Sequence, residues 1–334
     1  MPAIRIRNLC KTFKVPLPQK KKGVFASIKH FITHPTKNID AVKNLSFDIE
    51  RGEILGFLGA NGSGKSTTIK MLTGILTPTS GQVEVLGFTP HKQRRQFTPH
   101  IGLVLGQKSL LWWNIPVLDS FKLYRDIYNL KTGEFNKRLD SLCELLAMTP
   151  LLHIPVRKLS LGQRMRAEIC ASLLHHPEVI FLDEPTIGLD VLGRKKLKDF
   201  IKYLNQTEQT TVILTSHNMF DVEDLCKRCI IIDEGSTIYE GDIAQLKAEQ
   251  QEKVVTLVVE SVLDEARFQT TLANCTLLEK DGPHYTLQIS ERSLVATIEA
   301  FMASCQLADL HIVPPNLETV VERIWEQRSA RKVS

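Results

Sequence analysis

The sequence contains no apolar run long enough to cross a membrane. A bilayer-spanning helix needs about 20 consecutive apolar residues, and no stretch of the 334 residues approaches that length. The first five residues, Met-Pro-Ala-Ile-Arg, lack the apolar core of a secretory signal peptide. We therefore expect the chain to stay in the cytoplasm and to serve any membrane process through a partner.

A disulfide framework and a strong charge of either sign are also missing. The seven cysteines are scattered and odd in number, which is typical of a reducing compartment. Only Cys226 and Cys229 have a spacing that suits a metal, and no second pair of ligands is close in the sequence. We interpret them as incidental thiols between a helix and a strand. The net charge of +5 gives no argument for a nucleic-acid partner.

The strongest motif that is present runs from residue 59 to residue 67, Gly-Ala-Asn-Gly-Ser-Gly-Lys-Ser-Thr, and matches the P-loop pattern at every fixed position. An apolar run at residues 54–58 predicts a buried parallel strand before it, and apolar residues at helical spacing follow it. Backbone N–H groups in such a loop form an anion nest, so Lys65 would reach the outer phosphates of a nucleotide and Ser66 a magnesium ion. The expected nucleotide-binding residues are Gly59, Asn61, Gly62, Ser63, Gly64, Lys65, Ser66 and Thr67.

Two further predicted strands end in groups suited to phosphate chemistry. Residues 179–184 form a buried-strand pattern that ends in Asp183 and Glu184. One acid at such a strand end can hold magnesium through water, and the next can take a proton from an attacking water. The strand pattern of residues 210–216 is followed by His217, at the carboxyl edge where phosphates collect.

A second anion-binding helix start is predicted at Ser160, which is a suitable N-cap for the helix that follows. Nothing in one chain requires it to lie near the P-loop. Residues 108–170, which surround it, show helical periodicity and are expected to form a helical subdomain. The adjacent Trp112 and Trp113 cannot both face one core from a loop, so we expect at least one at an interface; the alternative is that both pack within the subdomain.

Two features near the N-terminus flank the nucleotide core. Phe13 precedes a second predicted strand, where it either stacks on adenine or packs within a hairpin. Residues 16–40 are rich in lysine, and Phe25, Ile28 and Phe31 recur there at helical spacing. Such a basic amphipathic helix either lies on an anionic membrane surface or packs on its own domain.

The end of the chain has a different pattern. With 334 residues, the chain is long enough for one large or two medium domains. We expect a first domain over residues 1–245. Residues 252–334 then show a strand, helix, hairpin, helix and strand in β-α-β-β-α-β order, which is the ferredoxin-like plan. We find no catalytic cluster in this part and expect a regulatory or dimerisation domain.

The order of these motifs resembles the nucleotide-binding subunits of ATP-binding cassette (ABC) transporters over about residues 3–245. It implies an α/β P-loop NTPase cassette with a parallel sheet core, an antiparallel β flank and a helical subdomain, followed by a small α+β domain. One departure is Leu161, where the family's signature has a second glycine; we expect less backbone freedom there but continued phosphate binding. The segments similar to the Walker A, Q-loop, signature, Walker B, D-loop and H-loop motifs are residues 59–67, Gln107, residues 159–163, residues 179–184, residues 188–190 and His217.

The resemblance implies a head-to-tail homodimer in which each ATP lies between the P-loop of one copy and the signature of the other. Ser66, Asp183 and Gln107 would organise Mg²⁺. Glu184 would be the general base and His217 the partner of the γ-phosphate. The residues that complete the site from across the dimer would be Ser160, Gly162 and Gln163, with Asp190 near the junction.

Among members of the family, the chain looks most like drug, viologen or lipid exporters whose membrane subunits are separate chains. It would then act at the cytoplasmic face of the membrane, bound to separate transmembrane permease subunits. One alternative is an importer ATPase whose C-terminal domain senses substrate. The other, a soluble cassette ATPase acting on nucleic acid or ribosomes, should carry tandem cassettes or a long coiled-coil insertion, and the sequence shows neither.

Overall fold

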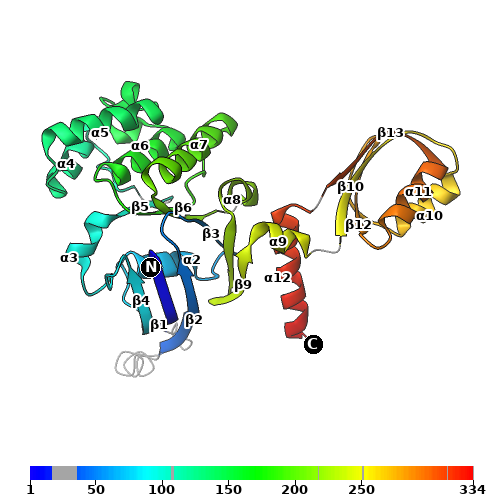
Figure 1. Ribbon diagram of the computed structural model, residues 1–334, viewed down its shortest axis with the longest axis horizontal. Helices are drawn as coiled ribbons and strands as arrows, with labels where there is room; N and C mark the ends of the chain where they lie inside the picture. Colours follow the sequence, from blue (N-terminus) through cyan, green and yellow to red (C-terminus); the bar gives the residue numbers. More distant parts are fainter. Residues whose placement is uncertain (17–35, 107–108, 217, 250–251, 314, 334) are drawn as a thin grey trace, which may run out of the picture. The chain divides into compact units, whose positions relative to one another are not determined.

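A computed structural model describes residues 1–16, 36–106, 109–216, 218–249, 252–313 and 315–333 of the chain (Figure 1). The chain divides into two compact units, Met1–Glu240 and Gly241–Ser334. Most of the basic segment 16–40, with its expected amphipathic helix, lies outside the described residues, as do Gln107 and His217. None of the helices within those described ranges is long and apolar enough to span a bilayer.

The centre of the first unit is a six-stranded sheet. Parallel pairing joins β3 to β7 and β8, and β6 to β5 and β7, because the apolar runs of these strands are covered on both faces. The carboxyl ends of β3 and β6, which carry the P-loop and the acidic pair, therefore reach the same edge. In order across the sheet the strands are β5 (Ile101–Leu105), β6 (Val179–Asp183), β7 (Thr211–Thr215), β3 (Ile54–Gly59), β8 (Arg228–Asp233) and β9 (Ser236–Asp242).

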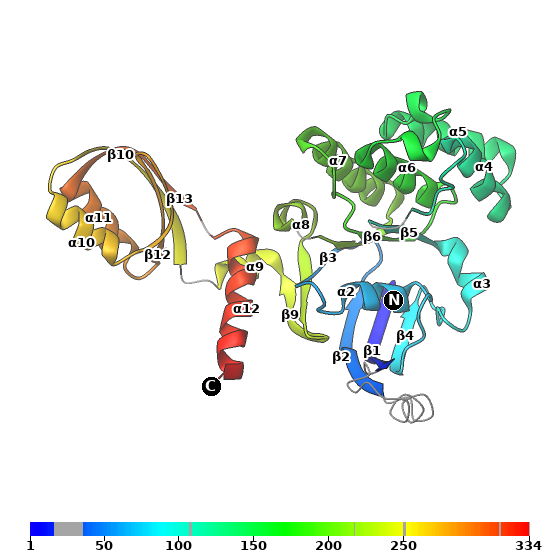
Figure 2. The same ribbon diagram turned by 180° about the vertical axis from the view of Figure 1, so that it is seen from behind.

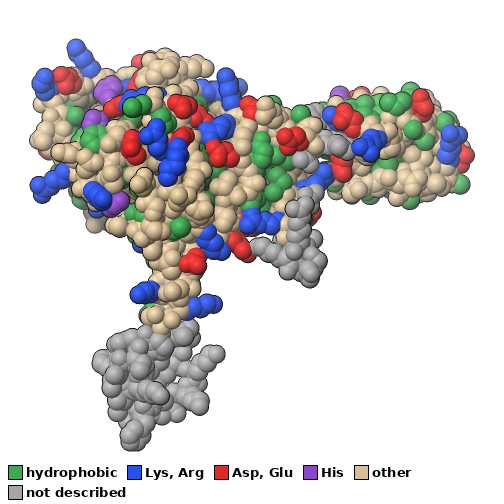
Figure 3. Space-filling model, turned by 60° about the horizontal axis from the view of Figure 1, so that its bottom comes forward, with side chains coloured by type: hydrophobic (Ala, Val, Ile, Leu, Met, Phe, Trp, Pro, Cys, Tyr) green, Lys and Arg blue, Asp and Glu red, His purple; other side chains and the backbone are tan. Residues whose placement is uncertain are grey.

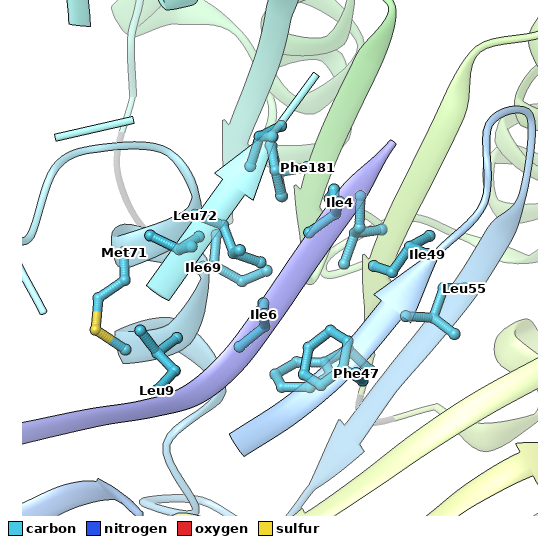
Figure 4. Packing of buried hydrophobic residues seen from close by; sticks show 14 of the residues in the cluster. Ile4, Ile6, Leu9, Phe47, Ile49, Leu55, Ile69, Met71, Leu72 and Phe181 are labelled. Carbon is cyan, nitrogen blue, oxygen red and sulfur yellow. The ribbon is translucent and has the colours of Figure 1, made fainter. Parts of the chain in front are cut away.

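An antiparallel sheet packs beside this core, as predicted. Its strands are β2 (Thr36–Ile49), β1 (Ile4–Pro16) and β4 (Ser80–Val85), in that order. Their alternating apolar side chains and those of α2 (Lys65–Leu72) share one cluster with the central sheet. Figure 4 shows part of this cluster, in which Ile4, Ile6, Leu9, Phe47 and Ile49 gather with Leu55, Ile69, Met71, Leu72 and Phe181.

Helices α4, α5, α6 and α7 lie on the opposite side of the central sheet from the antiparallel strands in both views (Figures 1 and 2). In the helical subdomain predicted over residues 108–170, α4 and α5 are separate helices, because the chain turns between them at Asn129, whose φ is 51°. The buried Arg138 guanidinium binds Glu208 at 2.9 Å (Nη2 to Oε2) and so attaches α5 to the end of α7. Besides α2, the α-helices described in this unit are α3 (Arg94–Phe97), α4 (Val117–Ile127), α5 (Thr132–Leu145), α6 (Leu161–Leu173), α7 (Val191–Glu208) and α8 (Met219–Leu225).

The second unit has the predicted β-α-β-β-α-β order. Its antiparallel sheet has the strand order β11-β12-β10-β13, which is that of a ferredoxin-like fold. Helices α10 and α11 cover one face and bury Phe268 and Phe301 against Leu257 and Leu287. The elements are α9 (Ile243–Ala248), β10 (Glu252–Val262), α10 (Glu265–Ala273), β11 (Thr276–Asp281), β12 (His284–Ser290), α11 (Leu294–Ser304), β13 (Cys305–Val313) and α12 (Leu317–Val333).

Candidate nucleotide-binding site

The P-loop joins β3 to the start of α2. Gly62 and Gly64 have φ values of 82° and 108°, which side-chain-bearing residues adopt only with strain. A Cβ on Gly64 would also lie 2.5 Å from the Ala41 carbonyl oxygen on β2. The glycine spacing of the motif is therefore required by the backbone, which leaves N–H groups free to form an anion nest at the start of α2.

Lys65 lies inside this loop. Its Nζ donates hydrogen bonds to the carbonyl oxygens of Gly59 at 2.6 Å and Ala60 at 3.1 Å. Burial lowers the pKa of Lys65, and the Glu184 and Asp183 carboxylates oppose that shift. The ammonium group is thus held at the loop, beside the two acids that follow β6.

Asp183 is oriented by two hydroxyl groups. The Thr215 Oγ1 donates to Asp183 Oδ1 at 2.6 Å, and the Ser66 Oγ donates to Oδ2 at 3.3 Å. The carboxylate therefore spans the gap between the end of β7 and the P-loop. Thr215 is not among the predicted site residues, although its position just before His217, at the end of a predicted strand, is a signal in the sequence.

Glu184 has an unusual backbone. Its φ of 56° is left-handed, a conformation that costs a non-glycine residue energy and persists where the surroundings hold it. The Glu184 N–H donates to the Thr215 carbonyl oxygen at 3.1 Å and lies 3.2 Å from its Oγ1. The turn after β6 therefore fixes the direction in which the Glu184 side chain leaves the sheet.

These groups line one cavity of about 290 Å³. Sequence reasoning missed four of its lining residues, namely Ala41, Lys70, Leu105 and Gly106. Gly59 and Ser63 do not line the cavity. A Cβ on Gly59 would lie 2.4 Å from the Ser63 hydroxyl oxygen, so these two residues pack against each other within the loop. The predicted residues that do line it are Asn61, Gly62, Gly64, Lys65, Ser66, Thr67, Asp183 and Glu184.

The residues predicted to complete the site from a second copy, Ser160, Gly162, Gln163 and Asp190, line a second, separate cavity of about 430 Å³. Ser160 caps α6 as predicted, and Gln163 completes a capping box by accepting from the Ser160 N–H at 2.9 Å. Asp190 caps α7 by accepting from the Gly193 N–H at 2.7 Å. Gly162 lies beside them in the lining. Within one chain, the residues that line the P-loop cavity (the P-loop group) and Ser160, Gly162, Gln163 and Asp190 (the Ser160 group) therefore line different cavities.

Phe13 lines neither of these two cavities. It lies on β1 opposite Ile39 of β2, with the Lys11 Nζ 5.2 Å from its ring centroid. Its stacking on adenine stays a prediction, as do the roles of Gln107 and His217.

The loop that follows residue 108 carries the two tryptophans. Trp112 is 42% and Trp113 49% exposed, so both reach the surface. The Trp112 and Tyr124 rings pack edge to face, with their centroids 5.9 Å apart. The Arg164 Cζ lies over the Trp113 ring, 5.6 Å from its centroid. The two alternatives for these tryptophans were a place at an interface and packing within the helical subdomain. In the structure both side chains are partly exposed and also pack on neighbouring side chains.

The chain is similar in sequence to known transport proteins. A family model described as ABC transporter matches residues 42–187. The ABC transporter ATP-binding protein NatA of Bacillus subtilis is 32% identical over 227 residues, which cover 68% of this chain and 92% of NatA. The linearmycin resistance ATP-binding protein LnrL of the same organism is 38% identical over 60% of this chain and 64% of its own length. A probable multidrug ABC transporter ATP-binding protein of Escherichia coli, YbhF, is 35% identical over 63% of this chain and 36% of its own length.

Solved structures agree in fold. A dimeric ATP-binding cassette, MJ0796, bound to ADP and Pi, has a TM-score of 0.60 at 24% identity and covers 72% of this chain and 98% of its own. CbiO1 from Clostridium perfringens, described as part of the transporter complex cbiONQ, has a TM-score of 0.60 at 25% identity over 75% of this chain and 92% of its own. The expected cassette fold is confirmed. The chain belongs to the ABC transporter ATP-binding proteins, and it binds and hydrolyses ATP as an ABC ATPase.

Proposed function

We propose that the chain is the ATPase subunit of an ABC exporter and acts as a homodimer on separate membrane-spanning subunits. The observation that carries this proposal is that the P-loop group and the Ser160 group line different cavities. A chain with one of each can complete two ATP sites by two-fold pairing with a second copy, which is the commonest form of oligomer. That a structural relative is described as dimeric supports the pairing.

In this proposal the P-loop amides and Lys65 bind the β- and γ-phosphates. The donor set beside them fits Mg²⁺, which prefers oxygen ligands: the Ser66 hydroxyl and the Asp183 carboxylate are 3.3 Å apart, and Gln107 would add an amide oxygen. When bound, Mg²⁺ would neutralise charge on the phosphates. Thr215 keeps the Asp183 carboxylate turned toward that position.

Glu184 is the proposed general base, because it follows Asp183 at the carboxyl edge of the sheet and its backbone is held by Thr215. It would accept the proton of the attacking water. His217 is the proposed γ-phosphate partner, and Phe13 the adenine platform. The second copy would supply Ser160, Gly162 and Gln163, with Asp190 close to the junction.

ATP favours the closed dimer because its phosphates contact both copies, and hydrolysis removes that difference in affinity. We propose that this cycle is passed on through an exposed apolar surface, which we call the docking surface. It consists of Trp112 and Trp113. Both lie in the loop that follows residue 108, so the surface comes a few residues after Gly106, which lines the P-loop cavity.

Export is favoured by relatives whose names refer to linearmycin resistance and multidrug transport. A second candidate, an importer subunit whose C-terminal domain senses substrate, is favoured by the separate core of the second unit.

In the exporter proposal residues 1–245 are the ATPase domain and residues 252–334 a regulatory or dimerisation domain, with the protein at the cytoplasmic face of the membrane. On the face in Figure 3 basic and acidic side chains are interspersed, which does not favour nucleic acid as the partner.

The test is reconstitution. The tagged chain is purified from membranes of its own organism, and the co-purifying membrane subunits are placed with it in vesicles with ATP on the outside. Accumulation of a candidate compound inside the vesicles supports export, because the cassette then lies on the side from which transport starts. ATP-driven loss of a preloaded compound to the outside supports the importer instead.

A further inference from the structure

Leu161, the departure in the signature, packs directly on Gly188. A Cβ on Gly188 would lie 2.1 Å from Leu161 Cδ2 and 2.6 Å from its Cγ. Leu161 is the first residue of α6 and is absent from the residues with positive φ, so its side chain costs no backbone strain there. Only a glycine at position 188 leaves room for this leucine.

The contact is reciprocal. A Cβ on Gly162 would lie 2.9 Å from Leu189 Cδ2, and Leu189 is buried. Each leucine therefore fills the space beside the glycine of the other segment. We call these four residues, Leu161, Gly162, Gly188 and Leu189, the interlock.

The interlock continues to Glu184 through two short turns. The Leu189 N–H donates to the Thr186 carbonyl oxygen at 3.2 Å, and the Ile187 N–H donates to that of Glu184 at 3.3 Å. Thr186 is itself buried. A displacement of Leu161 therefore also displaces residues 184–189, which these hydrogen bonds hold together.

We propose that Leu161 is a positioning residue through which the two ATP sites of the dimer communicate. This inference rests on the proposed homodimer. The start of α6 faces the ATP bound by the second copy, whereas Glu184 serves the ATP bound by its own chain. Engagement of Ser160 and Gly162 at one site is passed through the interlock to Glu184 at the other site, and by linkage the coupling acts in both directions.

The first measurement is the ATP dependence of hydrolysis by the purified chain. With two coupled sites the Hill coefficient can approach about 2, and we expect Leu161→Ala to bring it toward about 1. Ile75→Ala is the matched control, because Ile75 is similarly exposed, at 42%, and lies between α2 and β4, outside the interlock and both cavities. A Hill coefficient of about 1 in the wild type, or one that Leu161→Ala leaves unchanged, overturns the proposal.

A mutant cycle then tests the contact itself. Gly188→Ala places a methyl group against Leu161 and also strains a φ of 72°. In the background of Leu161→Gly the same substitution keeps the strain but loses the clash. We expect Gly188→Ala to lower kcat at least about 5-fold more in the wild-type background than in the Leu161→Gly background, a difference within the range typical of residues in contact. Equal effects in both backgrounds, with melting temperatures showing folded proteins, contradict the interlock.

Dimerisation of Glu184→Gln with ATP separates the two proposals. If this variant stays monomeric with ATP, the proposed homodimer fails and the interlock fails with it. If it dimerises while Leu161→Ala keeps the wild-type Hill coefficient, only the interlock fails.

Discussion

The Glu168 carboxylate of α6 accepts a hydrogen bond from the Leu110 N–H at 3.0 Å and a second from the Ser109 hydroxyl. Glu168 is 4% exposed. A buried carboxylate therefore joins the helix that starts at Ser160 to the loop that carries the docking surface. Movement of that loop must displace α6 or break these bonds.

Glu168 predicts a pH dependence of stability. Burial raises the pKa of Glu168 above its ordinary value of 4.5, and the hydrogen bonds from Ser109 and Leu110 oppose that shift. Because the folded state then holds the proton more tightly than the unfolded state, Glu168 reduces stability as the pH rises from about 4.5 through the raised pKa. Urea unfolding of wild type and Glu168→Gln at several pH values should show the wild type losing stability relative to the variant over that window. A difference independent of pH would contradict this.

Glu184→Gln tests the general base. The variant keeps the shape of the side chain but cannot take a proton, so we expect ATP binding to persist and turnover to fall about 10²- to 10⁴-fold. Fluorescent ATP-analogue binding and phosphate release measure the two effects. Wild-type turnover in Glu184→Gln would remove the base assignment.

Asp183→Asn should instead weaken the Mg²⁺ dependence of binding, because its partners are Ser66 and Thr215.

Replacing Trp112 and Trp113 with alanine tests the docking surface. Neither tryptophan lines the P-loop cavity, so ATP affinity should be unchanged while less membrane partner co-purifies. Trp325, the third tryptophan, lies on α12 and supplies the matched control. Equal co-purification by the double variant and Trp325→Ala would argue against this surface.

The sequence predicted the parts of the site whose residues are contiguous. The P-loop and the Asp183–Glu184 pair are each read from one short run, and the strand that precedes each run brings them to one edge of the sheet. The contact between Ser109 and Glu168 joins residues 59 apart and has no local pattern. Leu161 was expected to restrict the backbone, whereas its effect in the structure is a contact with Gly188, which only the tertiary fold brings near.

The ion pair between Arg138 and Glu208 should contribute far more to stability than the exposed pair Lys131–Glu134 on the same helix. Arg138 is buried, and its Nε also donates to the Leu173 carbonyl oxygen at 3.2 Å, so it joins α5, α6 and α7. Arg138→Ala removes the charged hydrogen bonds to Glu208 and to that carbonyl, although His176 still neighbours both acceptors, and should cost about 1.5 to 3 kcal/mol. Lys131→Ala removes a solvent-exposed pair and should cost about 0 to 1 kcal/mol. Urea unfolding of the two variants measures both values, and similar losses would show that the junction of the three helices does not depend on Arg138.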